Sequence, residues 1–209
     1  MKRGKLITLE GGEGVGKSTN LLFITRWLEQ RGVGFVQTRE PGGTPLAEQL
    51  RELLLSRRKE QVDPTAELLM VFAARAQHLA EVIQPALTRG EWVICDRFTD
   101  ATYAYQGGGR GLDGVLIGQL EQMVQGELRP DKVLLLDLDP QVGLKRAAGT
   151  GAADRFESEQ IAFFERVRAA YRARAAAAPE RYTIIDASAS LESIQHQLQC
   201  ELERLLLEA

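Results

Sequence analysis

The residues with the clearest chemical meaning form a glycine-rich segment near the start of the chain. Residues 11–19 read G-G-E-G-V-G-K-S-T and follow the apolar residues 6–9, so they fit the phosphate-binding pattern G-x-x-x-x-G-K-[ST] after a strand. In this pattern backbone N–H groups converge on phosphate oxygens, the lysine reaches the terminal phosphates and the serine hydroxyl binds Mg²⁺. A glycine-rich hairpin turn is the alternative, but the helical pattern that follows favours a site for ATP or GTP. The residues predicted to hold the nucleotide are Gly11, Gly12, Glu13, Gly14, Val15, Gly16, Lys17, Ser18 and Thr19.

A second group of polar residues lies outside the phosphate-binding pattern and is not needed to bind a triphosphate. Arg39 and Arg97 follow predicted strands and Arg75 lies on a predicted helix; guanidinium groups are well suited to phosphate. Each arginine alone is more typical of a surface or salt-bridge residue. Residues 102–106, T-Y-A-Y-Q, add hydroxyl, amide and ring groups suited to a base and a sugar, and a glycine turn is expected at 107–111. Together these residues predict a second nucleotide.

The phosphate-binding pattern does not by itself separate switches, motors and kinases. A guanine-recognition motif N-K-x-D is absent, because Asn20 is the only asparagine. Motor ATPases and sulfate-activating enzymes stay possible from the loop alone. The second group of polar residues favours a kinase.

Short apolar runs alternate with longer helical patterns along the whole chain. The runs predict strands at 6–10, 35–38, 92–96, 133–137 and 182–186, and helices are expected at 19–31, 45–55, 64–88, 113–124, 140–148, 158–178 and 191–208. Strands that alternate with helices imply right-handed βαβ units and a parallel sheet. The predicted class is therefore a three-layer α/β/α fold, with the whole chain 1–209 as one domain.

Acidic residues end four of the predicted strands, at Glu10, Asp96, Asp137 and Asp186. Ligands of open parallel sheets bind at the carboxyl ends of the strands. A turn or N-cap carboxylate is the plainer interpretation of Asp137 and Asp186. Asp96 differs, because Arg97 follows it directly.

Composition excludes several classes of partner. The net charge of −3 and a pI near 5.6 argue against general binding to nucleic acid or anionic membranes. Cys95 and Cys200 show neither disulfide nor zinc spacing. The basic start lacks the apolar region of a signal peptide, and no apolar run reaches the length of a membrane span. We therefore expect a cytoplasmic protein.

Six motifs, in order, resemble bacterial thymidylate kinase. They are T-L-E-G-G-E-G-V-G-K-S-T at 8–19, T-R-E-P-G-G-T at 38–44, F-A-A-R at 72–75, C-D-R-F at 95–98, A-Y-Q-G-G-G-R-G at 104–111 and A-D-R-F-E at 153–157. The resemblance implies transfer of the γ-phosphoryl group of ATP to dTMP, with Mg²⁺. It also implies a homodimer and a P-loop NTPase-type fold with a five-stranded parallel sheet of order 2-3-1-4-5.

The resemblance further implies roles for individual residues on the donor side. Lys17 holds the ATP phosphates and Ser18 binds Mg²⁺, which Asp96 orients through water. Glu13 approaches the dTMP 3′-hydroxyl or the shell of the metal. Because a dTMP phosphate is already anionic, it needs alignment and charge neutralisation rather than a general base. His78 and His196 are then expected to be structural.

On the acceptor side the resemblance places Arg97 and Arg39 beside the dTMP phosphate, with Arg51 as a helper. Arg75 donates to a thymine carbonyl, while Thr102 and Gln106 meet the edge of the base. Tyr105 packs under the sugar, where a 2′-hydroxyl would clash. The remaining residues assigned to the dTMP site are Pro41 and Phe72.

Two positions depart from the family pattern. The aromatic ring that stacks on thymine is expected four residues before Arg75, where this chain has Val71, and Phe72 follows it. The phosphate loop has no catalytic arginine, and neither does 149–153, the interior of a lid predicted near 146–157. An ordinary loop fits that segment equally well. We expect Arg155, and after it Arg146, to supply the missing catalytic cation.

Two other functions stay open from the sequence. One is a different nucleoside monophosphate kinase that acts on dUMP or UMP, because one methyl group gives only about 1–3 kcal/mol of discrimination. The other is a P-loop ATPase that works as a partner-binding switch.

Overall fold

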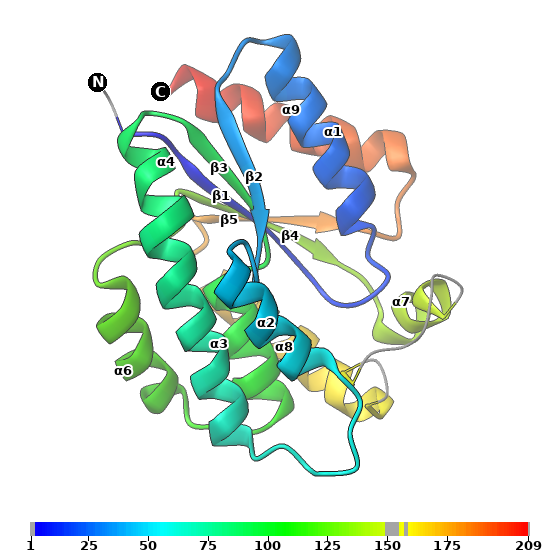
Figure 1. Cartoon of the computed structure of the whole chain (residues 1–209). Helices are drawn as coiled ribbons and strands as arrows, with labels where there is room; N and C mark the ends of the chain where they lie inside the picture. Colours follow the sequence, from blue (N-terminus) through cyan, green and yellow to red (C-terminus); the bar gives the residue numbers. More distant parts are fainter. Residues whose placement is uncertain (1–2, 149–154, 157–158, 209) are drawn as a thin grey trace.

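A parallel sheet of five strands forms the centre of the molecule (Figure 1). The computed structural model describes residues 3–148, 155–156 and 159–208. The strand order is β2-β3-β1-β4-β5, and all four pairs are parallel. The strands are β1 (Leu6–Glu10), β2 (Phe35–Arg39), β3 (Trp92–Asp96), β4 (Lys132–Asp137) and β5 (Tyr182–Asp186).

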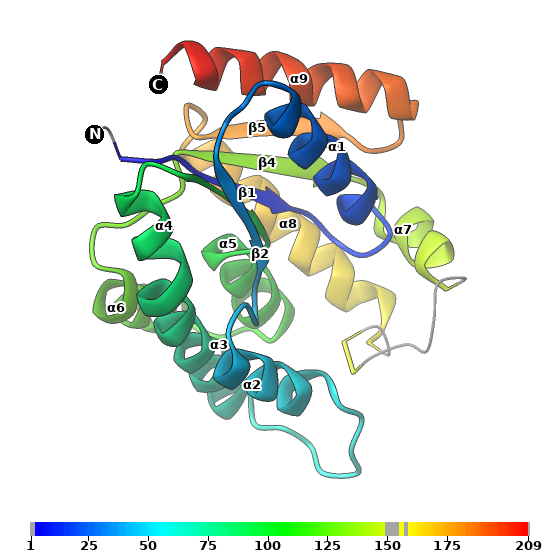
Figure 2. The same ribbon diagram turned by 45° about the horizontal axis from the view of Figure 1, so that its top comes forward.

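Helices cover both faces of the sheet, so the fold has three layers (Figure 2). One face packs against α1 (Lys17–Gln30) and α9 (Leu191–Leu207). Alternate side chains of each strand point to opposite faces, which is why Ile7 and Leu9 join this cluster whereas Leu6 packs on the other side. The other face carries α3 (Pro64–His78), η1 (Leu79–Ile83), α4 (Gln84–Thr88), α5 (Thr99–Thr102), η2 (Tyr103–Gly109), α6 (Gly114–Gln125) and α8 (Ile161–Ala177).

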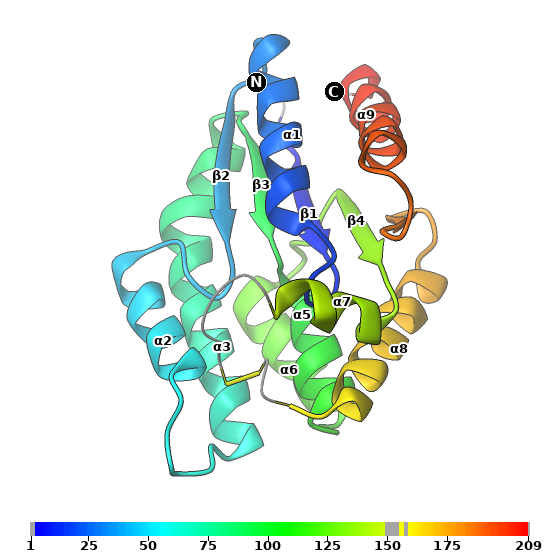
Figure 3. The same cartoon turned by 90° about the vertical axis from the view of Figure 1, so that its right-hand side faces the viewer.

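The carboxyl ends of the strands open towards two further helices, α2 (Pro45–Leu55) and α7 (Pro140–Ala147). Figure 3 shows α2, α3, α7 and α8 around these ends. The chain leaves β1 towards β2 on one side of the sheet, whereas the neighbouring β4 leads to β5 on the other. Divergence of neighbouring connections is where open α/β sheets bind ligands.

The fold class, the strand order and all five predicted strands are confirmed. The helix expected at 64–88 is helical throughout but changes to a π-helix at η1 and returns to an α-helix at α4. The glycine turn expected at 107–111 is wrong for Gly107, Gly108 and Gly109, which belong to the π-helix η2. The chain turns only at Arg110 and Gly111, where Gly111 has φ 78°. Glycine disfavours helices intrinsically, so local preference gave a misleading signal here.

Close packing explains why η2 contains consecutive glycines. A Cβ on Gly108 would lie 2.8 Å from both the Ala170 Cβ and the Arg166 carbonyl oxygen on α8. A Cβ on Gly109 would lie 2.4 Å from the Phe163 ring. The glycines therefore let η2 approach α8 closely, and tertiary packing outweighs the weak helix preference. This approach fixes Tyr105 and Gln106 beside the strand ends.

No helix in the described part of the chain is both long and apolar enough to span a bilayer. The predicted lid lies mostly at residues 149–154 and 157–158, outside the described residues.

Candidate functional site

The phosphate-binding loop connects β1 to α1 and packs tightly against α7. Gly14 has φ 66° and Gly16 has φ 87°, a left-handed conformation that glycine adopts without steric cost. A Cβ on Gly14 would also lie 1.9 Å from the Gly143 carbonyl oxygen. Only glycine fits at position 14, because of both the backbone conformation and the lack of space for a Cβ. The loop leads into the N-terminus of α1, where backbone N–H groups attract anions.

Lys17 folds back over this loop. Its Nζ donates to the carbonyl oxygens of Gly12 at 2.8 Å and Gly11 at 3.1 Å. Burial, together with the positive charge of Arg97, lowers the pKa of Lys17 to about 8, although Glu13 opposes the shift. An anion bound in the loop would restore a full positive charge on the lysine.

Glu13 is the centre of a charged cluster at the mouth of the loop. Its Oε1 accepts from Arg97 Nη2 at 2.8 Å and from the Tyr105 hydroxyl at 2.7 Å. Burial raises the pKa of this carboxyl, but the charges of Arg97 and Lys17 and these hydrogen bonds bring it down to about 2. Glu13 is therefore an anion throughout the neutral range.

Arg97 is held from several directions directly after β3. It is the only non-glycine residue with positive φ, 65°, in the described ranges, a conformation that costs energy. Its N–H donates to the Leu9 carbonyl at 3.0 Å and its Nη1 to the Gly11 carbonyl at 2.9 Å. The guanidinium also lies 4.8 Å from the centre of the Tyr105 ring. Arg97 is thus a preorganised cation between the loop and η2.

A cavity of about 600 Å³ joins the phosphate-binding loop to the groups that follow β2 and β3. It brings together most of the residues predicted from the sequence. Those that line it are Glu13, Gly14, Val15, Gly16, Lys17, Ser18, Thr19, Pro41, Arg51, Arg75, Asp96, Arg97, Thr102, Tyr105, Gln106 and Arg146.

Arg75 reaches the far end of this cavity from α3. Its Nε donates to Glu40 Oε2 at 2.7 Å and its Nη2 to Thr102 Oγ1 at 2.9 Å. The side chain is 1% exposed, and its Nη1 is buried with no hydrogen-bond partner among the described residues. A buried donor without a partner costs about 1–3 kcal/mol. The end of the cavity is therefore complementary to a ligand that offers an acceptor, such as a base carbonyl.

Asp96 shows the same feature on the donor side. Its Oδ1 is buried and unpartnered among the residues described, and it lines the cavity together with Ser18. Mg²⁺ is commonly held by one or two protein oxygens, substrate phosphates and water. No group of three or more His, Cys, Asp or Glu residues in the described ranges could hold a metal ion alone. The oxygens of Ser18 and Asp96 therefore fit an ion that arrives with a nucleotide.

Four predicted residues lie differently from expectation. Phe72 is absent from the cavity lining and packs with Leu68 and Ile117, whereas Val71 lines the cavity. A contact between Phe72 and the base stays a prediction: its ring packs between α3 and α6, and the Arg75 guanidinium lies 4.9 Å from the ring centre. Gly11 and Gly12 line a small neighbouring pocket, and their carbonyls hold Lys17.

Arg39 is the fourth. Its side chain is 54% exposed and paired with Glu48 at 2.8 Å, and it lines an adjacent hollow that also contains Ser18 and Asp96. Its position beside the acceptor phosphate therefore stays a prediction.

The two expected lid cations also differ. Arg146 lines the cavity, and its Nη1 donates to the Ala187 carbonyl at 3.0 Å. Arg155 does not line it and donates instead to Glu67 Oε2 at 2.6 Å and to the Leu54 carbonyl at 2.8 Å. In this structure Arg146 rather than Arg155 lines the cavity, and the choice of catalytic cation between them stays a prediction. The predicted lid interior, 149–153, is outside the described residues.

Sequence reasoning missed the buried carboxylate that supports Arg75. Glu40 accepts from Arg75 and contacts His78 Nδ1 at 3.0 Å, and the other nitrogen of that ring lies 2.7 Å from Thr38 Oγ1. His78 is fully buried and structural, as expected. The available signal was an acidic residue at the end of β2, next to Pro41.

Sequence reasoning also missed a second buried hydrogen-bonded pair, formed by Glu10 at the end of β1 and Tyr171 on α8. Glu10 accepts from the Phe98 N–H at 2.7 Å and from the Tyr171 hydroxyl at 2.8 Å. Burial, followed by the charge of Asp100, raises the pKa of Glu10 to about 8.

The other strand-end acids have ordinary roles. Asp186 accepts from the Ser188 N–H in a turn, as predicted, whereas Asp137 forms an ion pair with Arg168.

Comparisons with known proteins agree with this geometry. A family model described as thymidylate kinase matches residues 9–198. The thymidylate kinase of Teredinibacter turnerae is 60% identical over 203 residues, which cover 97% of this chain and 99% of that protein. That of Chromohalobacter salexigens is 59% identical over 208 residues and 98% of each chain. The crystal structure of thymidylate kinase from Ehrlichia chaffeensis matches with a TM-score of 0.77 and 33% identity, covering 96% of this chain and 99% of that one. The chain belongs to the thymidylate kinase family.

Proposed function

We propose that this protein transfers the γ-phosphoryl group of ATP to dTMP, giving dTDP and ADP. The observation that carries the proposal is one cavity that reaches from the phosphate-binding loop to Arg75, whose buried Nη1 has no hydrogen-bond partner within the described ranges. Such a cavity can hold two nucleotides with their phosphates facing each other. Bringing two reactants into line supplies much of the catalysis in phosphoryl transfer.

The donor end holds ATP through the loop backbone and Lys17. Ser18 and Asp96 would hold Mg²⁺, which neutralises charge on the transferring group when bound. Arg146 is the cation we place on the lid side of the donor phosphates, because it lines the cavity. Arg155 acts at a distance from the reacting atoms in this proposal.

The transfer step depends on Arg97. Its guanidinium lies between the loop carbonyl of Gly11 and the Glu13 carboxylate, so it can neutralise the acceptor phosphate as that group attacks. The acceptor oxygen is already anionic, so no general base is needed. Glu13 and Tyr105 share one hydrogen bond and would face the sugar hydroxyl of dTMP.

The acceptor base occupies the end lined by Arg75, Thr102 and Gln106. Arg75 Nη1 would donate to a carbonyl oxygen of thymine. Val71 supplies an apolar wall in place of an aromatic ring, while Pro41 and Arg51 close the side towards α2. Arg51 is held by a 2.9 Å hydrogen bond to the Pro41 carbonyl.

A homodimer and a cytoplasmic location are further parts of the proposal. Large apolar side chains on α3 and α6 are exposed, among them Leu69, Val115 and Met123, and such exposed patches often mark protein interfaces. Cys95 and Cys200 are both unpaired, as is usual in a reducing compartment. Sedimentation velocity would test the dimer.

A coupled assay of ADP release tests the activity. It compares dTMP, dUMP, UMP, GMP and no acceptor, with Mg²⁺ and ATP present throughout. We expect ADP release that depends strongly on dTMP. Equal rates with and without an acceptor would favour a switch ATPase. A preference for dUMP or UMP would show that the enzyme is a different nucleoside monophosphate kinase.

A further inference from the structure

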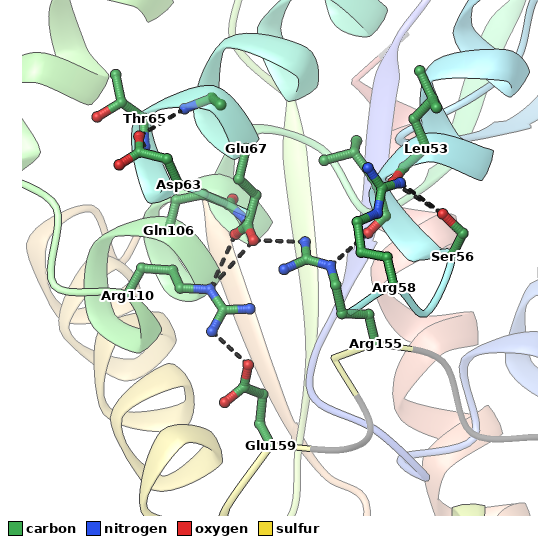
Figure 4. Close-up of polar contacts among 12 residues, drawn as sticks. Leu53, Ser56, Arg58, Asp63, Thr65, Glu67, Gln106, Arg110, Arg155 and Glu159 are labelled. Atoms are coloured by element: carbon green, nitrogen blue, oxygen red, sulfur yellow. Dashed lines mark hydrogen bonds and ion pairs between the residues drawn. The ribbon is translucent and has the colours of Figure 1, made fainter. Parts of the chain in front are cut away.

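One buried carboxylate connects three parts of the chain beside the acceptor end of the cavity. Glu67 on α3 is completely buried. Its oxygens accept from Gln106 Nε2 at 2.8 Å, Arg155 Nη2 at 2.6 Å and Arg110 Nε at 3.3 Å (Figure 4). Two guanidinium groups and one amide therefore converge on one side chain that does not itself line the cavity.

The contact with Glu67 determines which way the Gln106 amide faces. A carboxylate accepts hydrogen bonds and donates none, so only the NH₂ end of the amide can face it. Gln106 lines the cavity, and its oxygen must point away from Glu67. An amide oxygen directed at a pyrimidine accepts the N3–H of thymine, whereas the N3 of cytosine has no proton to give.

The contact with Arg155 connects the same carboxylate to the chain between α7 and α8. Arg155 also bonds the Leu54 carbonyl at 2.8 Å, and its N–H donates to the Leu55 carbonyl at 3.2 Å. The adjacent Phe156 lines the cavity and packs edge-on against Tyr105, with ring centres 5.8 Å apart. The position of residues 155–156 and the orientation of Gln106 thus depend on one group.

We propose that Glu67 is a positioning residue that orients Gln106 towards the acceptor base and ties residues 155–156 to that orientation. The inference rests on the proposed function, because it needs a pyrimidine nucleotide in the cavity. Removing Arg155 leaves Glu67 held by Arg110 and Gln106 alone, so the carboxylate shifts and carries the Gln106 amide away from its place at the cavity. Glu67 would then couple base recognition to a segment that lies outside the base site.

A double-mutant cycle on dTMP affinity tests the coupling, with calorimetry as the readout. We expect Arg155→Met to weaken dTMP binding by about fivefold or more in the wild-type background. In a Glu67→Gln background the same change should have less than about a twofold effect, because the connection is already broken. Equal effects of Arg155→Met in both backgrounds would overturn the proposal.

Arg58→Met is the matched control. Arg58 bonds the Leu53 carbonyl on α2, much as Arg155 bonds that of Leu54, but it has no contact with Glu67 (Figure 4). Its removal should leave dTMP affinity within about twofold. An equal loss with Arg58→Met would show that α2 contacts, rather than Glu67, carry the effect. If Glu67→Gln does not fold, Gln106→Ala replaces it as the second background, and Arg155→Met should again lose its effect.

Selectivity provides a readout that a purely structural role would not change. With Glu67→Gln the amide of Gln106 can rotate, so the preference for dTMP over dCMP in kcat/KM should fall by about tenfold. An unchanged ratio would contradict the orienting role. Failure of the wild-type protein to bind dTMP would instead refute the proposed function, which keeps the two failures distinct.

Discussion

The two ends of the cavity are built in different ways. The donor end is one continuous loop, residues 11–19, whose backbone N–H groups are proposed to bind the triphosphate. The acceptor end takes Arg75 from α3, Thr102 from α5 and Gln106 from η2, and buried carboxylates hold two of these side chains in place. Glu40 supports Arg75, and Glu67 supports Gln106.

This difference separates affinity for phosphate from selection of a base. Backbone amides bind any triphosphate, and their geometry is stored in local glycine conformations. A base is selected by the direction of a few side-chain donors and acceptors, which requires partners from distant parts of the chain. A substitution should therefore change the KM for ATP or the KM for dTMP, but not both. Arg97 is the exception, because it lies where the two ends of the cavity meet.

The largest expected effect is at that meeting point. Arg97→Ala should lower kcat by about 10³-fold or more, because the acceptor phosphate loses the cation that neutralises it during transfer. Steady-state kinetics with both substrates at saturation measure the effect. A variant that keeps more than about a tenth of wild-type kcat would show that Arg97 is not part of the transfer step.

An acceptor-side change comes next. Glu40→Gln should raise KM for dTMP by about 10- to 100-fold, because Arg75 loses its charged partner, while KM for ATP should change little. Glu48→Gln is the matched control, because Glu48 pairs with the exposed Arg39. Equal increases in both KM values would mean that the two ends are not independent.

The third prediction concerns pH and the donor end. The pKa of Lys17 is lowered to about 8, so the ammonium loses its proton as pH rises above that value. Since kcat/KM reports the free enzyme, kcat/KM for ATP should fall about fivefold between pH 8 and pH 9, as the protonated fraction of Lys17 drops from about one half to about one tenth. Lys17→Arg, which keeps its charge, should show no such decrease, and a wild-type profile flat to pH 10 would refute the assignment.

The smallest effect on activity is expected in the packing beneath the acceptor end. Gly108→Ala should destabilise the fold by about 1–3 kcal/mol, because its Cβ would crowd α8. Gly114→Ala has open space around it and serves as the control. Urea unfolding measures both. A Gly108→Ala variant as stable as wild type would mean that η2 and α8 have room to separate.

The comparison also explains how much could be predicted from the sequence. The loop, the strands and the residues Arg75, Arg97, Thr102, Tyr105 and Gln106 were predicted because each belongs to a short local pattern. Glu40 and Glu67 were not, since their partners Arg75 and Gln106 are 35 and 39 residues away. A pairing over such distances leaves no local signal.

Packing between elements accounts for two differences from the sequence predictions. Phe72 and Val71 are neighbours on a helix, and only the packing of α3 against α6 decides which of them faces the cavity. Residues 107–109 were predicted as a turn because glycine disfavours helices, yet α8 requires the absence of a Cβ there. In both cases a tertiary contact overrides the local preference.

The proposed reaction takes place in one cavity, where the γ-phosphoryl group passes from ATP at the phosphate-binding loop to dTMP held by Arg75 and Gln106. Its most direct test supplies ATP labelled in the γ-phosphoryl group, Mg²⁺ and dTMP, and then separates the products. The label should appear in dTDP in amounts equal to the ADP formed, and transfer should stop when dTMP is omitted. Label released as inorganic phosphate at the same rate with and without dTMP would contradict the claim.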